Sequence, residues 1–275
     1  MSYQVILLYK FVTISDPALV RDQQKALCQE LGLTGRMLIA PEGINATFEG
    51  EPAAIKQYQV AAQKVFGDLT FKTSAGTGRA FTGLKIKVRP EIVTLGRTDF
   101  NVPQETAPVV TAEELEAMYQ RDEDFVVLDL RNDYEIKAGQ FEQTVDPGLH
   151  HFRDLPEKLG KLKKIKNKKI VAVCTGGIRC EKATCLLKRE GFDNVYQLKD
   201  GIHTYLAKYP GKQGRFKGTL FVFDNRLVTP VVEGIERTVI GVCTYCQSAC
   251  ETFYNDDSVR PSRKVICCAD CIAEH

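Results

Sequence analysis

One cysteine of this chain lies in a setting that could make it a reactive thiolate. Residues 170–173 (IVAV) are apolar and β-branched at three of four positions, which predicts a buried parallel strand ending at Cys174. A turn follows, leading into a helix expected over 180–190, and its residues are Thr175, Gly176, Gly177, Ile178 and Arg179. The inward N–H groups of such a loop, the start of the helix and the arginine favour thiolate over thiol. Cys174 is therefore the candidate nucleophile, and a buried structural cysteine is the alternative.

The spacing between the cysteine and the arginine distinguishes phosphatase chemistry from persulfide chemistry. Cys174–Arg179 spans six residues, one fewer than the loop with which a cysteine phosphatase wraps a tetrahedral phosphate. The shorter loop suits a sulfur atom carried on the cysteine as a persulfide. In the helix that follows, we interpret Cys185 as core, and Cys180 as either core or a resolving thiol.

A second group of cysteines has the spacing of a metal site. Six of the ten cysteines lie in the last 33 residues, where two CxxC pairs are separated by 21 residues. The paired residues are Cys243 with Cys246, and Cys268 with Cys271. Each pair can direct both thiolates from one tight turn to the same ion, which suits tetrahedral zinc, with iron as the alternative. We expect a structural ion that closes a small C-terminal module.

The segments around Cys174 predict a domain with a parallel sheet. Thr111, with Glu114 three residues later, is a capping box that predicts a helix through Tyr119. Apolar runs at 125–130 and 195–198 predict further strands, and a helix is expected over 201–208. This alternation indicates a three-layer α/β/α domain. Asp129 and Arg131, at the end of one strand, could pair with each other or orient a neighbouring loop.

The first hundred residues predict a smaller fold of the α+β class. Strands are expected at 5–12, 35–40, 43–48, 69–73 and 84–88, and helices at 17–31 and 52–66, each helix beginning at a proline. This is the order of a ferredoxin-like βαββαβ domain, which hosts many functions. Lys85 and Lys87 alternate with apolar residues on the last strand, and Arg89 follows it. One face of the strand would thus be basic, and it could contact RNA or only water.

Length and composition set the number of domains and the class of protein. The chain has 275 residues, of which 44% are hydrophobic and 26% charged, and its net charge is +2, which is ordinary for a globular protein. We expect a ferredoxin-like domain at 1–100, an α/β domain at 109–212 and a cysteine-rich module at 213–275. The N-terminus lacks the features of a signal peptide, and no apolar run is as long as a membrane span. We expect a cytoplasmic protein without membrane contact.

Short stretches spread over nearly the whole chain carry a resemblance to known proteins. The first runs over 128–139 and contains LDLR, YE and Gly139. The second is CTGGIR at 174–179, and the third is LKDGI at 198–202. They occur in the order found in the rhodanese superfamily, with one departure at Gln140, where many rhodaneses have histidine. More specific stretches lie at 40–45, 87–93, 131–135, 146–148, 151–153, 174–183 and 223–226. Together they resemble the rhodanese-like tRNA uridine hydroxylases.

The resemblance implies an activity and roles for the loop residues. Members of this family use O₂ to place a hydroxyl group on C5 of the wobble uridine of tRNA. By resemblance, Cys174 is the persulfide-forming nucleophile, and the loop amides and Arg179 stabilise its charge. tRNA would be the substrate and molecular oxygen the co-substrate, with no obligate protein partner implied. One hypothesis is that the thiolate, or its persulfide, attacks C6 of the uracil, which makes C5 an enolate-like carbon that captures oxygen.

Two other functions stay open at this point. A plain sulfurtransferase would carry sulfane sulfur as a Cys174 persulfide, but it would need neither the N-terminal domain nor the cysteine-rich tail. A non-catalytic binding module would use the rhodanese domain only for docking, but it would not need Cys174 and Arg179. The hydroxylase is therefore the function that we expect.

Two spare cysteines leave the composition of the metal site open. Cys267 could replace Cys268 as a ligand, and Cys250 has no assigned role. Relatives carry additional cysteines between the two CxxC pairs, whereas 251–264 contains none here. This difference predicts one metal ion rather than two.

Overall fold

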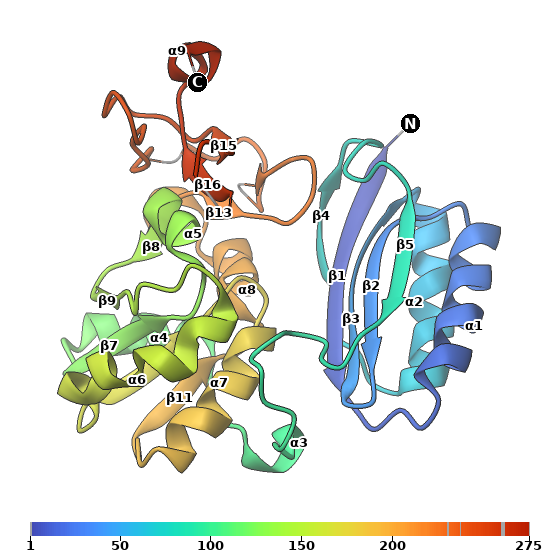
Figure 1. Ribbon diagram of the computed structural model, residues 1–275, viewed down its shortest axis with the longest axis horizontal. Helices are drawn as coiled ribbons and strands as arrows, with labels where there is room; N and C mark the ends of the chain where they lie inside the picture. Colours follow the sequence, from blue (N-terminus) through green and yellow to red (C-terminus); the bar gives the residue numbers. More distant parts are fainter. Residues whose placement is uncertain (1, 230, 237, 260–261, 275) are drawn as a thin grey trace. The chain divides into compact units, whose positions relative to one another are not determined.

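The chain forms two compact units, Met1–Thr106 and Ala107–His275 (Figure 1). This computed structural model describes residues 2–229, 231–236, 238–259 and 262–274. Within those ranges every helix is too short or too polar to pass through a lipid bilayer.

The first unit is a five-stranded sheet with two long helices on one face (Figure 1). Its elements are β1 Tyr3–Phe11, α1 Pro17–Glu30, β2 Thr34–Ala40, β3 Gly43–Gly50, α2 Pro52–Phe66, β4 Lys72–Gly76, β5 Leu84–Val88 and the short α3 Val102–Glu105. The strand order is β4-β1-β3-β2-β5, in which β5 runs parallel to β2 and the other neighbours are antiparallel. The first four strands have the ferredoxin-like order that the sequence predicts, and β5 adds an edge.

Local sequence explains where these elements begin. The Asp16 carboxylate accepts hydrogen bonds from the N–H groups of Ala18 and Leu19, and Pro17 occupies the first helical position of α1. The strand predicted at 69–73 begins only at Lys72, where pairing with Leu7 of β1 starts. Leu69 and Phe71 precede it and pack against the apolar core instead. The prediction was therefore too long at its start, because the alternate apolar residues Leu69 and Phe71 reflect packing in the core and not strand pairing.

The second unit is built on a parallel sheet in the order β6-β11-β10-β7-β9. Its first elements are β6 Val109–Val110, α4 Ala112–Gln120, β7 Phe125–Asp129, α5 Asp133–Ala138, β8 Gly139–Phe141, β9 Thr144–Val145, η1 Phe152–Asp154, α6 Leu155–Leu162 and η2 Lys163–Ile165. They are followed by β10 Lys169–Val173, α7 Ile178–Arg189, β11 Val195–Leu198, α8 Gly201–Lys208 and η3 Gly211–Gln213. The capping box of Thr111 and Glu114 is present at the start of α4. The predicted strands and helices therefore occur, and β10 is the central strand.

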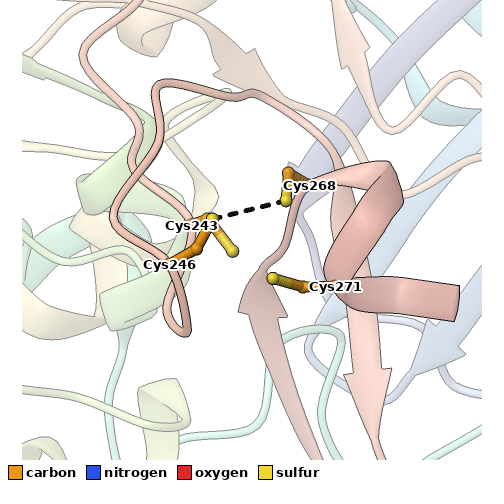
Figure 2. A group of neighbouring side chains, drawn as sticks. All are labelled: Cys243, Cys246, Cys268 and Cys271. Atoms are coloured by element: carbon orange, nitrogen blue, oxygen red, sulfur yellow. Dashed lines mark hydrogen bonds between the residues drawn. The ribbon is translucent and has the colours of Figure 1, made fainter. Parts of the chain in front are cut away.

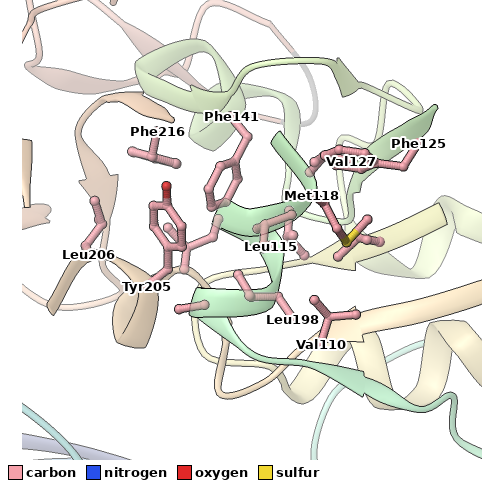
Figure 3. Packing of buried hydrophobic residues seen from close by; sticks show 14 of the residues in the cluster. Val110, Leu115, Met118, Phe125, Val127, Phe141, Leu198, Tyr205, Leu206 and Phe216 are labelled. Atoms are coloured by element: carbon pink, nitrogen blue, oxygen red, sulfur yellow. The ribbon is translucent and has the colours of Figure 1, made fainter. Parts of the chain in front are cut away.

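The two faces of this sheet are both covered, as a three-layer fold requires. On one face Val127, Val171 and Val173 pack with residues of α4 and α8, including Leu115 and Tyr205 (Figure 3). The alternate residues Leu128, Ile170 and Ala172 are also fully buried, and α7 contacts both β10 and β11. Burying one large apolar side chain contributes about 1.5–3 kcal/mol, so these layers hold β10 firmly.

The C-terminal segment of the second unit continues this core. Its elements are β12 Phe216–Gly218, β13 Leu220–Phe221, β14 Val228–Thr229, β15 Phe253–Asp256, β16 Arg263–Ile266 and α9 Ala269–Glu274. Strand β12 pairs antiparallel with β8, and Phe216 and Leu220 lie in the same apolar cluster as the sheet residues. The strand predicted at 220–223 is short because the chain turns after Phe221 to pair β13 with β14.

Candidate active site and candidate metal centre

Cys174 lies directly after the central strand β10, at the carboxyl edge of the parallel sheet, and its side chain is fully buried. Gly177 has φ +101°, which turns its N–H toward the cysteine, and this N–H donates a hydrogen bond to the sulfur at 3.2 Å. Helix α7 begins at Ile178, two residues earlier than predicted, so Arg179 and Cys180 lie in its first turn. Their backbone N–H groups also donate to the Cys174 sulfur. Of the predicted loop residues, Gly177 and Arg179 thus form, together with Cys180, a cradle for an anionic sulfur.

Opposing effects act on the pKa of Cys174. Burial alone would raise it, because the thiolate loses its hydration. A hydrogen bond from the Cys180 thiol, the positive charge of Arg179 and the backbone N–H groups together lower the pKa of Cys174 to about 5. Burial and this hydrogen bond raise the pKa of Cys180, so Cys180 stays a donor. Cys174 is therefore a thiolate at neutral pH, and Cys180 contacts its sulfur.

Arg179 is held by a carboxylate that sequence reasoning did not single out. Its Nη1 and Nη2 donate to Oε1 and Oε2 of Glu135 at 2.7 and 3.0 Å, and Nη2 also donates to Thr175 Oγ1 at 3.0 Å. Glu135 comes from α5, where its carboxylate also accepts the Asn132 N–H. Glu135 is part of the YE stretch that carries the family resemblance, but nothing in the sequence pairs it with Arg179, which is 44 positions away. Planar bidentate pairing fixes the guanidinium orientation.

The N-terminus of α8 supports the loop from its other side. The Ile202 N–H donates to the Cys174 carbonyl at 2.9 Å, and the His203 N–H to the Thr175 carbonyl at 3.0 Å. Gly201 has φ +72°, and a Cβ atom there would lie 2.7 Å from both the Cys174 oxygen and the Gly177 nitrogen. The glycine in LKDGI is therefore needed for close backbone approach.

Asp129 and Arg131 form the pair that their positions suggested. Arg131 Nε and Nη2 donate to Asp129 at 2.9 and 2.6 Å, and both side chains are fully buried. The Arg131 guanidinium also lies 5.6 Å from the ring centre of Phe216 in β12. This pair therefore connects the end of β7 with the C-terminal segment.

The four cysteines of the two CxxC pairs come together in the C-terminal segment (Figure 2). The Sγ atoms of Cys243, Cys246, Cys268 and Cys271 all lie within 4.8 Å of one another. Hydrogen bonds from the N–H of Cys246 and other groups lower the pKa of Cys243 to about 5, whereas burial and neighbouring sulfurs raise that of Cys271. A dication that binds four thiolates removes this competition for protons. The donor set fits one tetrahedral metal ion.

The hairpin β15–β16 brings the two pairs together from distant parts of the segment. The Cys243 N–H donates to the Ser248 carbonyl at 2.8 Å, and the Thr244 N–H to the Ile266 carbonyl at 2.8 Å. The first bond closes the turn of the first pair, and the second ties that pair to β16, the strand that leads into the second pair. Of the spare cysteines, Cys267 is buried with its sulfur directed to the Cys268 carbonyl at 3.6 Å, and Cys250 packs near Phe253. The structure thus gathers Cys268, and not Cys267, with the other three.

The basic residues of β5 are exposed on one face of the first sheet. Lys85 and Lys87 are exposed and alternate with the half-buried Ile86, which packs against the core under the helices. Arg89 follows and is also exposed. Arg36 on β2 is the register partner of Lys85 and adds a further exposed cation to that face, which sequence reasoning missed.

Three family models match the chain in succession. The UPF0176 acylphosphatase like domain matches residues 3–92, the Rhodanese-like domain residues 111–208 and the Rhodanase C-terminal model residues 217–275. The second match contains Cys174 and Arg179, and the third contains the four gathered cysteines.

Relatives match this chain over nearly its whole length. The tRNA uridine(34) hydroxylase of Onion yellows phytoplasma (strain OY-M) is 38% identical over 271 residues, covering 96% of this chain and 87% of that protein. The protein of the same name from Staphylococcus carnosus (strain TM300) is 38% identical and covers 100% of this chain and 91% of its own length. A crystal structure of a rhodanese-related protein from Thermoplasma volcanium matches with a TM-score of 0.31 and 23% identity, over 37% of this chain and 92% of that one.

Proposed function

The chain belongs to the family of the tRNA uridine(34) hydroxylases, and on this premise we propose that it hydroxylates C5 of the wobble uridine of tRNA, with Cys174 as the attacking group. The observation that carries the proposal is the full-length match to relatives of that name. The buried thiolate in an anion-stabilising cradle supplies the chemistry that such a reaction can use. We propose molecular oxygen as the source of the hydroxyl oxygen.

We propose a role in this reaction for the groups that surround the Cys174 sulfur. The Cys174 thiolate adds to C6 of the uracil, and C5 then attacks molecular oxygen to form a C5 hydroperoxide. An external two-electron donor, such as a thiol reductant, reduces the O–O bond, so that one oxygen stays on C5 as a hydroxyl group and the other leaves as water. Loss of the C5 proton then restores the ring double bond and expels the Cys174 thiolate. Thr175 and Glu135 hold the Arg179 guanidinium in place, so its charge stabilises anionic character beside the sulfur. The N–H of Gly177 and the first-turn N–H groups of α7 act on the sulfur before attack and after its release.

The sulfurtransferase alternative has less support. The same loop could carry sulfane sulfur on Cys174, because its amides would stabilise a persulfide equally well. The names of the full-length relatives, however, describe hydroxylation of a tRNA uridine. The first unit with its basic β5 and the cysteine-rich segment are parts that a tRNA enzyme can use for RNA contacts.

We propose a structural zinc ion for the cysteine site and a cytoplasmic enzyme that acts on tRNA. Cys243, Cys246, Cys268 and Cys271 would hold the ion through four thiolates, a donor set typical of zinc. Bound zinc would supply a cross-link between the two knuckles. Lys85, Lys87 and Arg89 are proposed to contact phosphates of the tRNA.

The decisive experiment follows the modified nucleoside directly. Purified full-length protein is incubated with unmodified tRNA and a thiol reductant as two-electron donor, in air or in heavy-isotope oxygen gas, and nucleosides are analysed by mass spectrometry. We expect 5-hydroxyuridine that carries the oxygen isotope, and its loss in Cys174→Ser. Cys185→Ala, which removes a buried thiol further along the same helix, is the matched control and should stay active. Full 5-hydroxyuridine formation by Cys174→Ser would overturn the role of Cys174, and thiosulfate:cyanide activity with unchanged tRNA would favour the sulfurtransferase.

A further inference from the structure

Phe223 is an exposed aromatic side chain that lies against the Cys174 loop. Its ring centre is 5.7 Å from the guanidinium carbon of Arg179, and 51% of the residue is exposed. A single exposed apolar side chain is ordinary on a protein surface. Phe223 differs from the other large exposed hydrophobic residues of the described ranges, which are valines and one leucine, because it is aromatic and contacts the candidate active site.

The surrounding hairpin fixes Phe223 in this exposed position. The Val222 N–H donates to the Leu227 carbonyl at 2.8 Å, which closes the turn between β13 and β14. Inside that turn the buried Asp224 carboxylate accepts the N–H of Arg226 at 3.0 Å and pairs with its guanidinium at 2.6 Å. Phe221 packs edge-on against Phe223 with ring centres 5.1 Å apart. The aromatic ring is therefore held outward by a rigid turn, since both of its neighbours are buried.

Cys174 is buried and Phe223 is exposed, and this difference decides whether the ring can reach the target base or one of its neighbours. The Cys174 side chain is 0% exposed, so a base that reacts with its sulfur must leave the solvent and its own stack. A base on the exposed surface of Phe223 stays outside that site. The exposed ring of Phe223 is therefore accessible to a neighbour of the target base and not to the target base once it has entered the site.

We propose that Phe223 stacks on a nucleotide adjacent to the target uridine and holds the anticodon loop open while the target base enters the Cys174 site. Aromatic side chains stack on unpaired bases with little sequence preference, because every base has a π-face. The contact with Arg179 places this platform beside the site. This inference rests on the proposed function for its substrate, but it concerns RNA binding and not the chemical step.

A chemical double-mutant cycle tests the stack. Wild-type protein and Phe223→Leu are compared on anticodon stem-loop RNAs that carry either a normal nucleotide or an abasic site on each side of the target uridine, and dissociation constants are measured. We expect Phe223→Leu to weaken binding of the normal RNA about 5- to 150-fold, and Phe223→Tyr or Phe223→Trp to bind like wild type. With an abasic site at one of the two positions, the Leu variant and wild type should bind alike. An equal loss on all the RNAs, or full binding by Phe223→Leu, would overturn the stack.

Two controls separate stacking from damage to the site. Val239→Ala removes another exposed apolar side chain of the C-terminal segment and should leave binding unchanged. The pH dependence of Cys174 alkylation should be the same in Phe223→Leu and wild type, whereas a shift would show that the ring acts only through Arg179. Because binding is the readout, the result stands even if the bound RNA is not hydroxylated, which would instead contradict the proposed function.

Discussion

Arg179 and Glu135 form a two-point ion pair that is almost completely buried. The two N–O distances are 2.7 and 3.0 Å, and the side chains are 8% and 0% exposed. Burial would raise the pKa of Glu135, but the charge of Arg179 and its hydrogen bonds lower it below the ordinary value. Glu135 is therefore a carboxylate that shares the guanidinium with the Cys174 thiolate, so the cradle contains one cation between two anions.

We expect Glu135→Gln to destabilise the protein by about 3–5 kcal/mol, because it leaves the buried Arg179 charge without its partner. Urea unfolding at neutral pH measures this loss. Glu123→Gln, which breaks only partly exposed pairs with Arg121 and Lys169, is the control and should cost about 0–1 kcal/mol. The folded-state pKa of Glu135 is depressed, so its contribution is complete above the unfolded value of about 4.3 and is lost as the pH falls below it. Equal stability of Glu135→Gln and wild type would contradict this account.

Replacing Cys180 should change the titration of Cys174. The Cys180 thiol donates to the Cys174 sulfur, so Cys180→Ala removes one group that stabilises the thiolate. Iodoacetamide labelling of Cys174, followed by mass spectrometry across a pH series, should give a midpoint near 5 in wild type and a higher midpoint in Cys180→Ala. Cys185→Ala should leave the midpoint unchanged. An unshifted midpoint in Cys180→Ala would assign Cys180 to the core alone.

Adding one methyl group at Gly201 should disrupt the loop. In Gly201→Ala the new Cβ would clash with the backbone of Cys174 and Gly177 at 2.7 Å, and the residue would hold φ at +72°. We expect lower stability in thermal unfolding and loss of 5-hydroxyuridine formation. Gly160→Ala, in helix α6, has nothing within 4 Å of its Cβ and should instead stabilise the helix by about 0.5–1 kcal/mol. If both variants unfold like wild type, close approach at Gly201 is not needed.

The metal site predicts different outcomes for two adjacent cysteines. Cys268 belongs to the group of four sulfurs, whereas the Cys267 sulfur lies outside this group and is directed to the Cys268 carbonyl. Elemental analysis of purified protein should give about one zinc per chain, which Cys268→Ser loses and Cys267→Ser keeps. A chelator should lower the melting temperature of wild type, because ion binding contributes folding free energy. Full metal content in Cys268→Ser would exclude Cys268 as a ligand of the ion.

The basic face of β5 predicts a salt-dependent effect on tRNA affinity. Lys85 and Lys87 are exposed on the side of the sheet away from the core, and the double change to glutamine removes two charges. We expect weaker binding and a smaller dependence of log affinity on log salt, by about 0.7–0.9 for each lost phosphate contact. Replacing the exposed Lys25 and Lys56 on the two helices by glutamine is the matched control. Equal salt slopes for the two double variants would exclude β5 from the RNA contact.

Sequence patterns located the parts of the candidate site that are continuous along the chain. Three such parts are predicted by patterns of only a few residues. The apolar run before Cys174 predicts the strand, the two glycines predict the loop, and the CxxC pairs predict the cysteine cluster. The same holds for the capping box at Thr111. Local hydrogen bonding and burial decide these features, so neighbouring residues are enough to predict them.

The other parts of the site depend on contacts between distant segments. Glu135 meets Arg179, and Phe223 meets the same guanidinium from the C-terminal segment, although single-sequence periodicity relates neither residue to Cys174. The choice of Cys268 over Cys267 depends on which sulfur the turn before α9 directs toward the other three cysteines. Such pairings are set by how layers pack, which a single sequence leaves open.

The pairing of β12 with β8 gives the C-terminal segment a second consequence. A protein shortened after residue 212 would lose Phe216 and Leu220 from its interior and leave Gly139–Phe141 as an unpaired strand edge. Free edges of this kind invite strand addition from another chain and hence aggregation. The segment that holds the four cysteines therefore also covers this strand edge, and we expect an isolated 109–212 fragment to aggregate more readily than the whole chain.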